Sequence, residues 1–270
     1  MNKKFAVCSV VNRKYIDYLK VFSYSLVKHN PSFSGDYVVF YEDGDLVESD
    51  FEDLRKIYSR FVFRKVPQER YKNLNTSDPR LENTEHSKKI MKWTYYRLEM
   101  FDLDGYDFAV WFDTDMLVMR NLDELFSDNL SNRLENCVAG VEDLLVKKIF
   151  HDRMDEYLAH DQINGGVLFI GKNVMCKKVY EDLIGLLPEA YRFKKNDQSM
   201  FIEYFGGQGR LEHIDYKFNV GRKMLERNRI PLSEVHILHY PGQGKPTNPN
   251  RPADSHKYWF AMKSEMDRSL

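Results

Sequence analysis

The stretch that decides the fold is an apolar run ending in two aspartates: residues 106–119 read Tyr-Asp-Phe-Ala-Val-Trp-Phe-Asp-Thr-Asp-Met-Leu-Val-Met. Phe108–Phe112 is short and continuously apolar, which predicts a buried strand. Asp113 and Asp115 follow two residues apart, so on an extended backbone their carboxylates converge while Thr114 faces elsewhere. Two like charges about 4 Å apart repel by roughly 4 kcal/mol at an effective dielectric constant near 20. A divalent cation that prefers oxygen ligands, Mg²⁺ or Mn²⁺, would relieve this repulsion. A solvated acidic turn is the alternative.

Composition excludes several classes of protein. The chain has 270 residues, 43% apolar side chains and a net charge of −1, so it can bury a sizeable core and has no general attraction to nucleic acid. Cys8, Cys137 and Cys176 are odd in number and lack CxxC spacing, which favours reduced thiols over a disulfide framework or a zinc site. No apolar stretch approaches the roughly 20 residues of a membrane helix. We therefore expect a cytoplasmic protein without an integral membrane segment.

Apolar runs alternate with helical periodicity along the chain. Strands are predicted at 5–11, 37–41, 61–66, 108–112, 137–141, 167–170 and 235–239, and helices at about 15–29, 49–60, 87–101, 144–159, 173–187, 197–205 and 255–267. This alternation predicts an α/β fold with a mostly parallel sheet and helices on both faces. Ligand sites in such sheets lie beyond the carboxyl ends of the strands, where Asp113 and Asp115 fall.

Two basic side chains and a histidine lie at positions that suggest contacts to an anion or a metal. Arg97 falls near the middle of the apolar face of the predicted 87–101 helix, whereas Glu99 lies opposite. A guanidinium there needs an anion, either a ligand phosphate or the aspartate pair. A snorkelling stem or a structural ion pair is the alternative. His239 ends the last predicted strand, and Gly242 and Lys245 follow it. This arrangement suits a metal-bound phosphate ligand, although a lone histidine is more often structural.

Two further segments combine conformational freedom with polar groups. Asn164-Gly165-Gly166 precedes the predicted strand 167–170, and its glycines allow either close backbone approach to a ligand or a simple turn. Asn196-Asp197-Gln198 stands where a helix begins, so free backbone amides meet a carboxylate there. An ordinary helix N-cap is the alternative for this second segment.

Taken in order, these segments resemble glycosyltransferase family 8, whose members are retaining enzymes of GT-A fold, over about residues 5–250. The resemblance implies a GT-A domain over 1–250, with a helical tail over 251–270 packed on the same domain. It implies Asp113, Asp115 and His239 as ligands of Mn²⁺ or Mg²⁺, and Asp197 and Gln198 as catalytic residues beside the reacting sugar carbon. Contacts to the nucleotide-sugar donor are implied for Val11, Asn12, Tyr15, Arg97, Thr114, Asp161, Asn164, Gly166, Gly242 and Lys245.

The expected function is therefore metal-dependent, retaining transfer of a hexose from a UDP-linked donor to a saccharide or another hydroxyl acceptor. Gly165 replaces the usual Ala or Ser of the family, and Thr247 replaces a common Trp, which leaves the sugar and the acceptor open. Two alternatives remain. A haloacid-dehalogenase-type phosphatase also carries Asp-x-Asp, but there the motif opens the domain, and here three predicted strands precede it. A catalytically inactive nucleotide-sugar-binding protein is the second alternative.

Overall fold

The first part of the chain builds the parallel half of a central sheet. In a computed structural model, which describes residues 3–76, 92–142, 163–193, 195–227 and 229–270, four strands run parallel. They are β1 (Phe5–Val10), β2 (Asp36–Tyr41), β3 (Phe61–Lys65) and β4 (Phe108–Phe112). Helices α1 (Ile16–His29) and α2 (Glu48–Ile57) make the first two crossovers. The predicted strand–helix alternation is confirmed here, because each crossover returns the chain to the same end of the sheet.

Three later strands complete a seven-stranded sheet of order β3-β2-β1-β4-β7-β6-β8. They are β6 (Val138–Glu142), β7 (Ile163–Gly171) and β8 (Leu211–Ile214). Only β7 runs antiparallel to both of its neighbours, so the sheet is mostly parallel, as predicted. The turn alternative for Asn164–Gly166 is wrong, because these residues lie inside β7. Asn164 pairs with Val141 near the end of β6, beyond a register shift between Gly140 and Val141, and local sequence does not signal this long-range pairing.

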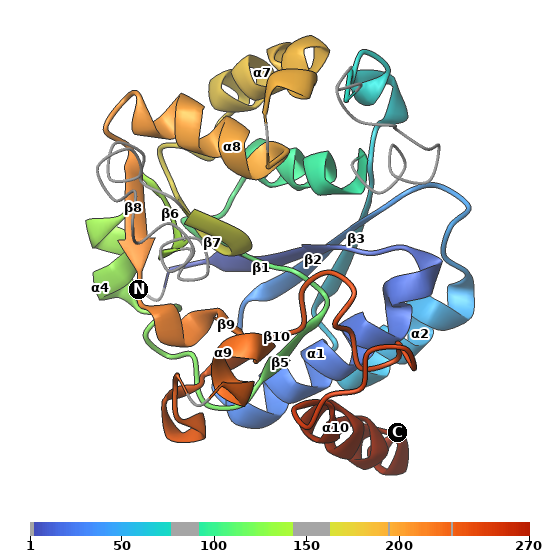
Figure 1. Cartoon of the computed structure of the whole chain (residues 1–270). Coiled ribbons are helices and arrows are strands. Elements are labelled where there is room, and N and C mark those ends of the chain that lie inside the picture. The colour runs from blue at the N-terminus through green and yellow to red at the C-terminus, as the bar shows by residue number, and fades with distance from the viewer. Residues whose placement is uncertain (1–2, 77–91, 143–162, 194, 228) are drawn as a thin grey trace.

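Side chains alternate across the sheet into two separate cores. In β1, Ala6 and Cys8 face one core, whereas Phe5 and Val7 face the other. The first core lies under the 3₁₀ helix η3 (Tyr96–Asp102), α7 (Lys177–Gly185) and α8 (Asp197–Phe201), and the second lies under α1 and α2. Figure 1 shows these helices as two layers with the sheet between them. Helices on both faces are therefore confirmed.

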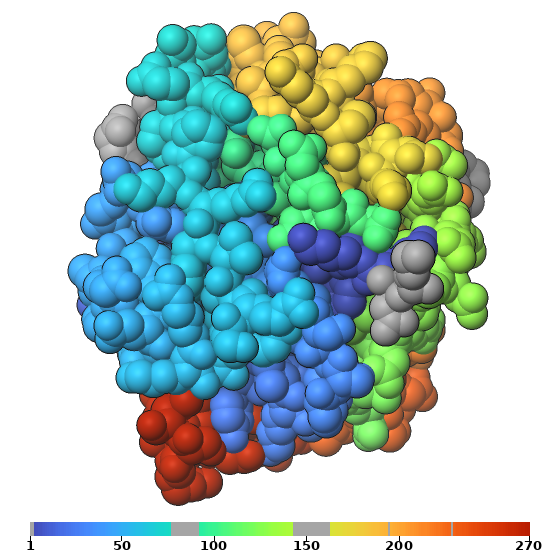
Figure 2. Space-filling model, turned by 180° about the vertical axis from the view of Figure 1, so that it is seen from behind, coloured from blue at the N-terminus to red at the C-terminus, as the bar shows by residue number. Residues whose placement is uncertain are grey.

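A small second sheet places the last strand beside the aspartate pair. β10 (Ile237–His239) pairs antiparallel with β5 (Met116–Val118) and parallel with β9 (Val220–Gly221). The C-terminal helix α10 (His256–Ser269) buries Trp259, Met262 and Met266 in a third core together with residues of α1 and β10. Seen from behind in Figure 2, this helix (red) lies at the lower edge of the molecule beside the N-terminal segments (blue).

Several shorter elements complete the described residues, and some differ from prediction. They are α4 (Asp128–Arg133), α9 (Arg222–Glu226), and the short helices η1 (Arg13–Tyr15), η2 (Gln68–Tyr71), η5 (Leu187–Arg192), η6 (Ile202–Gly206), η7 (Tyr216–Phe218) and η8 (Leu232–Glu234). The predicted 197–205 helix divides into α8 and the π-helical turn η6. The described part of the predicted 87–101 helix ends as the 3₁₀ helix η3, and the predicted 144–159 helix lies outside the described residues. No described helix is long and apolar enough to span a bilayer.

Candidate functional site

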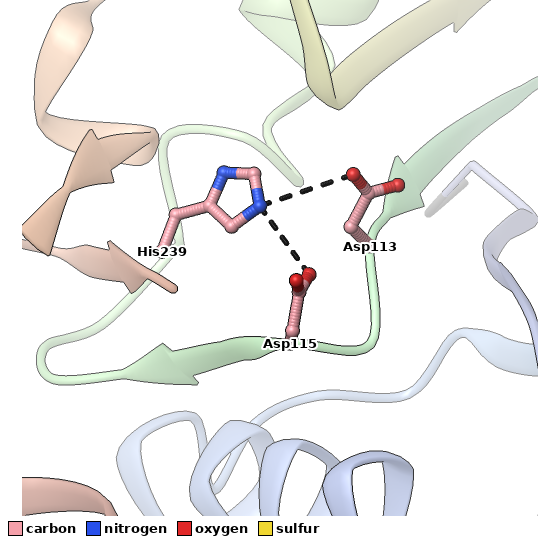
Figure 3. A group of neighbouring side chains, drawn as sticks. All are labelled: Asp113, Asp115 and His239. Atoms are coloured by element: carbon pink, nitrogen blue, oxygen red, sulfur yellow. Dashed lines mark ion pairs between the residues drawn. The ribbon is translucent and has the colours of Figure 1, made fainter. Parts of the chain in front are cut away.

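Two aspartates and a histidine converge at the carboxyl end of β4. Asp113 follows β4, Asp115 precedes β5, and His239 ends β10, which the antiparallel register places beside Met116. One ligand atom from each of the three lies within 4.8 Å of the others (Figure 3). His239 Nε2 is 3.3 Å from Asp115 Oδ1 and 3.9 Å from Asp113 Oδ2. Two carboxylates and an imidazole form a donor set that suits Mn²⁺ or Mg²⁺ together with further oxygen ligands. These three residues could therefore hold a divalent cation.

Lys245 supplies a positive charge at the edge of this cluster. Its Nζ lies 2.6 Å from Asp115 Oδ2 and donates to the carbonyl oxygen of Gly242 at 3.0 Å. Burial alone would raise the pKa of Asp115, but His239 and Lys245 outweigh burial and hold it well below its usual range. Burial opposes the charge on Lys245 in turn, yet the Asp115 carboxylate more than compensates and raises the pKa of Lys245. Asp115 is therefore an anion throughout the physiological pH range.

Arg97 links the cluster to the start of α8. Its side chain is only 8% exposed, and Nη2 donates to Asp113 Oδ1 at 3.1 Å while Nε lies 2.9 Å from Asp197 Oδ2. The Nε contact has the distance of an ion pair but not the alignment of a hydrogen bond. Burial raises the pKa of Asp197 to about 6, although the charge of Arg97 lowers it. Of the predicted partners, Arg97 therefore contacts the aspartate pair through Asp113, and it also forms a buried ion pair with Asp197. A contact to a ligand phosphate stays a prediction, although Arg97 lines the cleft described below.

The glycine-rich start of β7 lets other groups approach its backbone closely. Arg97 Nη1 donates to the Gly165 carbonyl oxygen at 2.6 Å, and the Gly165 N–H donates to Gln198 Oε1 at 2.9 Å. A Cβ on Gly165 would lie 2.4 Å from Arg97 Nη1, and a Cβ on Gly166 would lie 2.7 Å from His239 Cε1. The absence of a side chain at both positions is therefore a condition for the observed packing.

A cleft of about 200 Å³ opens beside the cluster. Seven of the residues predicted from sequence line it: Asn12, Tyr15, Arg97, Asp113, Thr114, Asp115 and Lys245. Thr114 reaches the cleft because the backbone bends at residues 114–115, so the expectation that an extended backbone turns Thr114 away is wrong. Sequence reasoning missed Val10, Trp93, Thr94 and Trp111, which also line the cleft. Trp111 could have been predicted from the sequence, because it precedes Asp113 by two residues and so lies on the same side of an extended strand. In the structure its Nε1 donates to Asp113 Oδ1 at 2.9 Å.

Some predicted residues are placed differently. Val11 is 1% exposed and packs in the core under α1, so its neighbour Val10 takes the position at the cleft. Asn196 lies next to the predicted catalytic pair and directly before α8, with a φ of 52°. Its side chain makes no capping hydrogen bond, so the ordinary N-cap that was the alternative for this segment is not observed. Asp161 lies outside the described residues. The structure thus groups the other predicted residues around one region without testing their roles.

The fold and the site define a glycosyltransferase of GT-A type. The sequence profile described as Glycosyl transferase family 8 matches residues 6–248, and the chain belongs to that family. No match was found among curated proteins.

Solved structures with similar folds support this classification. The galactosyltransferase LgtC, solved with donor and acceptor sugar analogues, has a TM-score of 0.71 at 18% identity and covers 98% of this chain and 100% of its own. GlyE from Streptococcus pneumoniae TIGR4 has a TM-score of 0.67 at 19% identity, covering 97% of this chain and 63% of GlyE. Mouse xyloside xylosyltransferase 1 has a TM-score of 0.57 at 15% identity, with coverages of 94% and 100%. At these identities the likeness concerns the fold.

Proposed function

We propose that the chain transfers a hexose from a UDP-linked donor to a hydroxyl group of a saccharide or another acceptor, with retention of configuration and with Mn²⁺ or Mg²⁺ as cofactor. The observation that carries this proposal is the convergence of Asp113, Asp115 and His239 beside a cleft that Tyr15 and Lys245 also line. Family membership excludes the phosphatase alternative. The three candidate ligands are all present, which argues against an inactive binding protein.

The charges of the site fit a cation and a diphosphate together. Three carboxylates, Asp113, Asp115 and Asp197, face two basic side chains, Arg97 and Lys245, so the site carries one net negative charge when His239 is neutral. A dication would reverse that sign and make the site attractive to a diphosphate. When bound, the metal neutralises charge that develops on the leaving diphosphate.

The chain's own residues then have distinct tasks. Tyr15 offers an aromatic face to the base, and the Lys245 ammonium lies 5.3 Å from the centre of its ring. We infer that Lys245 turns from Asp115 towards the donor phosphates, where its charge stabilises the leaving group. Gln198 presents its carbonyl oxygen beside Gly165, and this oxygen can stabilise positive charge on the anomeric carbon. We further propose that Asp197, which is paired with Arg97, binds sugar hydroxyls.

The three cysteines support a cytoplasmic location as part of this proposal. Cys8, Cys137 and Cys176 are all free in the structure, as expected of a chain that folds in a reducing compartment.

A panel of UDP-hexoses with Mn²⁺ tests the proposal by the release of UDP. We expect one or a few sugars to be turned over, with activity lost in EDTA and in Asp113→Asn or Asp115→Asn, since each change removes an anionic ligand but little volume. Asp107→Asn is the matched control, because Asp107 pairs with Lys172 on the surface. Full activity in EDTA, or wild-type rates in both aspartate variants, would contradict the metal-dependent mechanism.

A further inference from the structure

The two ring nitrogens of His239 face different surroundings. Nε2 points at the aspartate pair (Figure 3), whereas Nδ1 lies 2.9 Å from Asn219 Oδ1. A histidine can bind a cation through Nε2 only when that nitrogen carries a lone pair instead of a hydrogen. What fixes the hydrogen on Nδ1 therefore decides whether the cluster can receive a metal.

A chain of hydrogen bonds sets the direction of the Asn219 amide. The Gly166 backbone N–H, which can only donate, donates to Asn164 Oδ1 at 2.9 Å. Asn219 Nδ2 donates to the same Asn164 Oδ1 at 2.8 Å. With its NH₂ group committed to Asn164, Asn219 must turn its carbonyl oxygen towards His239. Nδ1 of His239 is then the nitrogen that donates, and in the neutral ring Nε2 is left with its lone pair towards the carboxylates.

We propose that Asn219, oriented by Asn164, is a positioning residue that holds His239 in the tautomer required for metal binding. This inference rests on the proposed function for its purpose, but the hydrogen-bond direction follows from the contacts alone. Outer-shell partners of this kind fix the tautomer and the ring orientation of metal-binding histidines. Asn164, for which the family resemblance implies a donor contact, would then also orient Asn219.

The small sheet explains how distant residues form this relay. β9 pairs parallel with β10, with Val220 opposite Leu238 and Gly221 opposite His239. Because side chains alternate along a strand, Asn219 projects to the same face as His239 and stands one step before β9. Gly166 also packs closely against the ring, since a Cβ at this position would lie 2.9 Å from Nδ1. The imidazole is therefore held by hydrogen bonding and by packing.

Nitrogen NMR of the imidazole tests the inference without any enzyme assay. In metal-free wild-type protein labelled with ¹⁵N-histidine, at a pH where the ring is neutral, we expect the His239 signals of an Nδ1–H tautomer. The His239→Gln variant identifies these signals among the eight histidines of the chain. An Nε2–H tautomer in the wild type would overturn the proposal, whether or not any variant folds.

Two matched pairs of variants separate tautomer control from general packing. Asn219→Leu should lose the Nδ1–H tautomer and weaken Mn²⁺ binding roughly ten- to a hundred-fold, whereas Asn219→Asp keeps the acceptor for Nδ1–H and should retain the tautomer. Asn164→Asp keeps an acceptor for both N–H groups and should bind Mn²⁺ better than Asn164→Leu. Asn173→Leu is the control, because Asn173 bonds Asn136 on the surface.

The outcomes distinguish this proposal from the proposed function. Wild-type tautomer and Mn²⁺ affinity in Asn219→Leu, with an unchanged melting temperature, would overturn the relay. A chain that shows the Nδ1–H tautomer but releases UDP from no nucleotide sugar would support the relay and contradict the proposed function.

Discussion

A single methyl group at Gly166 should disable the metal cluster while leaving its three ligands in the sequence. In Gly166→Ala the new Cβ would lie 2.6 Å from Met116 Cε and 2.7 Å from His239 Cε1. The Met116 methyl is the end of a flexible side chain and can turn away. The His239 ring has less freedom, because Asn219 holds its Nδ1.

The geometry sets the size of the effect. Ordinary contact begins at 3.4 Å, so the ring must move by about 0.7 Å. Metal sites tolerate deviations of about 0.2 Å in ligand distance, so a shift of this size should weaken Mn²⁺ binding roughly ten- to a hundred-fold. Overpacking of this kind costs about 1–3 kcal/mol of stability, or several degrees in melting temperature.

Isothermal titration with Mn²⁺ and thermal unfolding measure the two effects separately. Gly221→Ala is the matched control: Gly221 lies opposite His239 in the neighbouring strand, and a Cβ there would meet no atom within 4 Å. We expect wild-type affinity in the control. Equal Mn²⁺ affinity in Gly166→Ala and Gly221→Ala would refute the packing argument.

The remaining predictions concern the cleft and α8. Arg97→Met should destabilise the protein by about 3–5 kcal/mol in urea unfolding, because Asp113 and Asp197 lose their buried counter-charge; unchanged stability together with unchanged donor affinity would show that the ion pairs contribute nothing. Burial raises the pKa of Asp197 from 3.8 to about 6, so the folded protein retains a proton that the unfolded chain releases, and stability falls as the pH rises through this interval. Between about pH 4 and pH 7 the metal-free wild type should therefore lose roughly 2 kcal/mol more stability than Asp197→Asn. Parallel pH profiles of the two proteins would be inconsistent with this. Tyr15→Ala should weaken binding of free UDP as well as of the sugar donor in calorimetry. Equal UDP affinity in the variant and the wild type would show that Tyr15 only packs in the core. Gln198→Ala should lower kcat while UDP affinity and melting temperature stay near the wild-type values. Normal turnover in this variant would show that Gln198 has no catalytic role.

Local sequence patterns were sufficient for the strands and for the aspartate pair. The apolar run Phe108–Phe112 coincides with β4, and the alternation of strands and helices fixed the parallel half of the sheet. His239 at a predicted strand end is indeed the end of β10, beside the pair. These successes share a cause, because a buried strand and the polar residues at its end are both encoded by neighbouring positions.

Features that depend on contacts between residues far apart in the sequence were not predicted. Glu99, predicted on the outward face of a helix, is 7% exposed and accepts hydrogen bonds from Tyr71 and Tyr180. The 3₁₀ geometry of η3 changes the angular positions that an α-helical wheel assumes, and neither tyrosine is near in sequence. Asn219 gave no signal either, because its role depends on the pairing of β9 with β10.

Anomalous diffraction at the manganese edge, from crystals grown with Mn²⁺ and UDP, would locate the cation relative to Asp113, Asp115 and His239. We expect a manganese peak in contact with Asp113, Asp115 and His239 and with the diphosphate of UDP, with Lys245 turned from Asp115 towards the phosphates. UDP bound in the cleft without a peak at these three side chains, or with manganese bound elsewhere, would contradict this expectation.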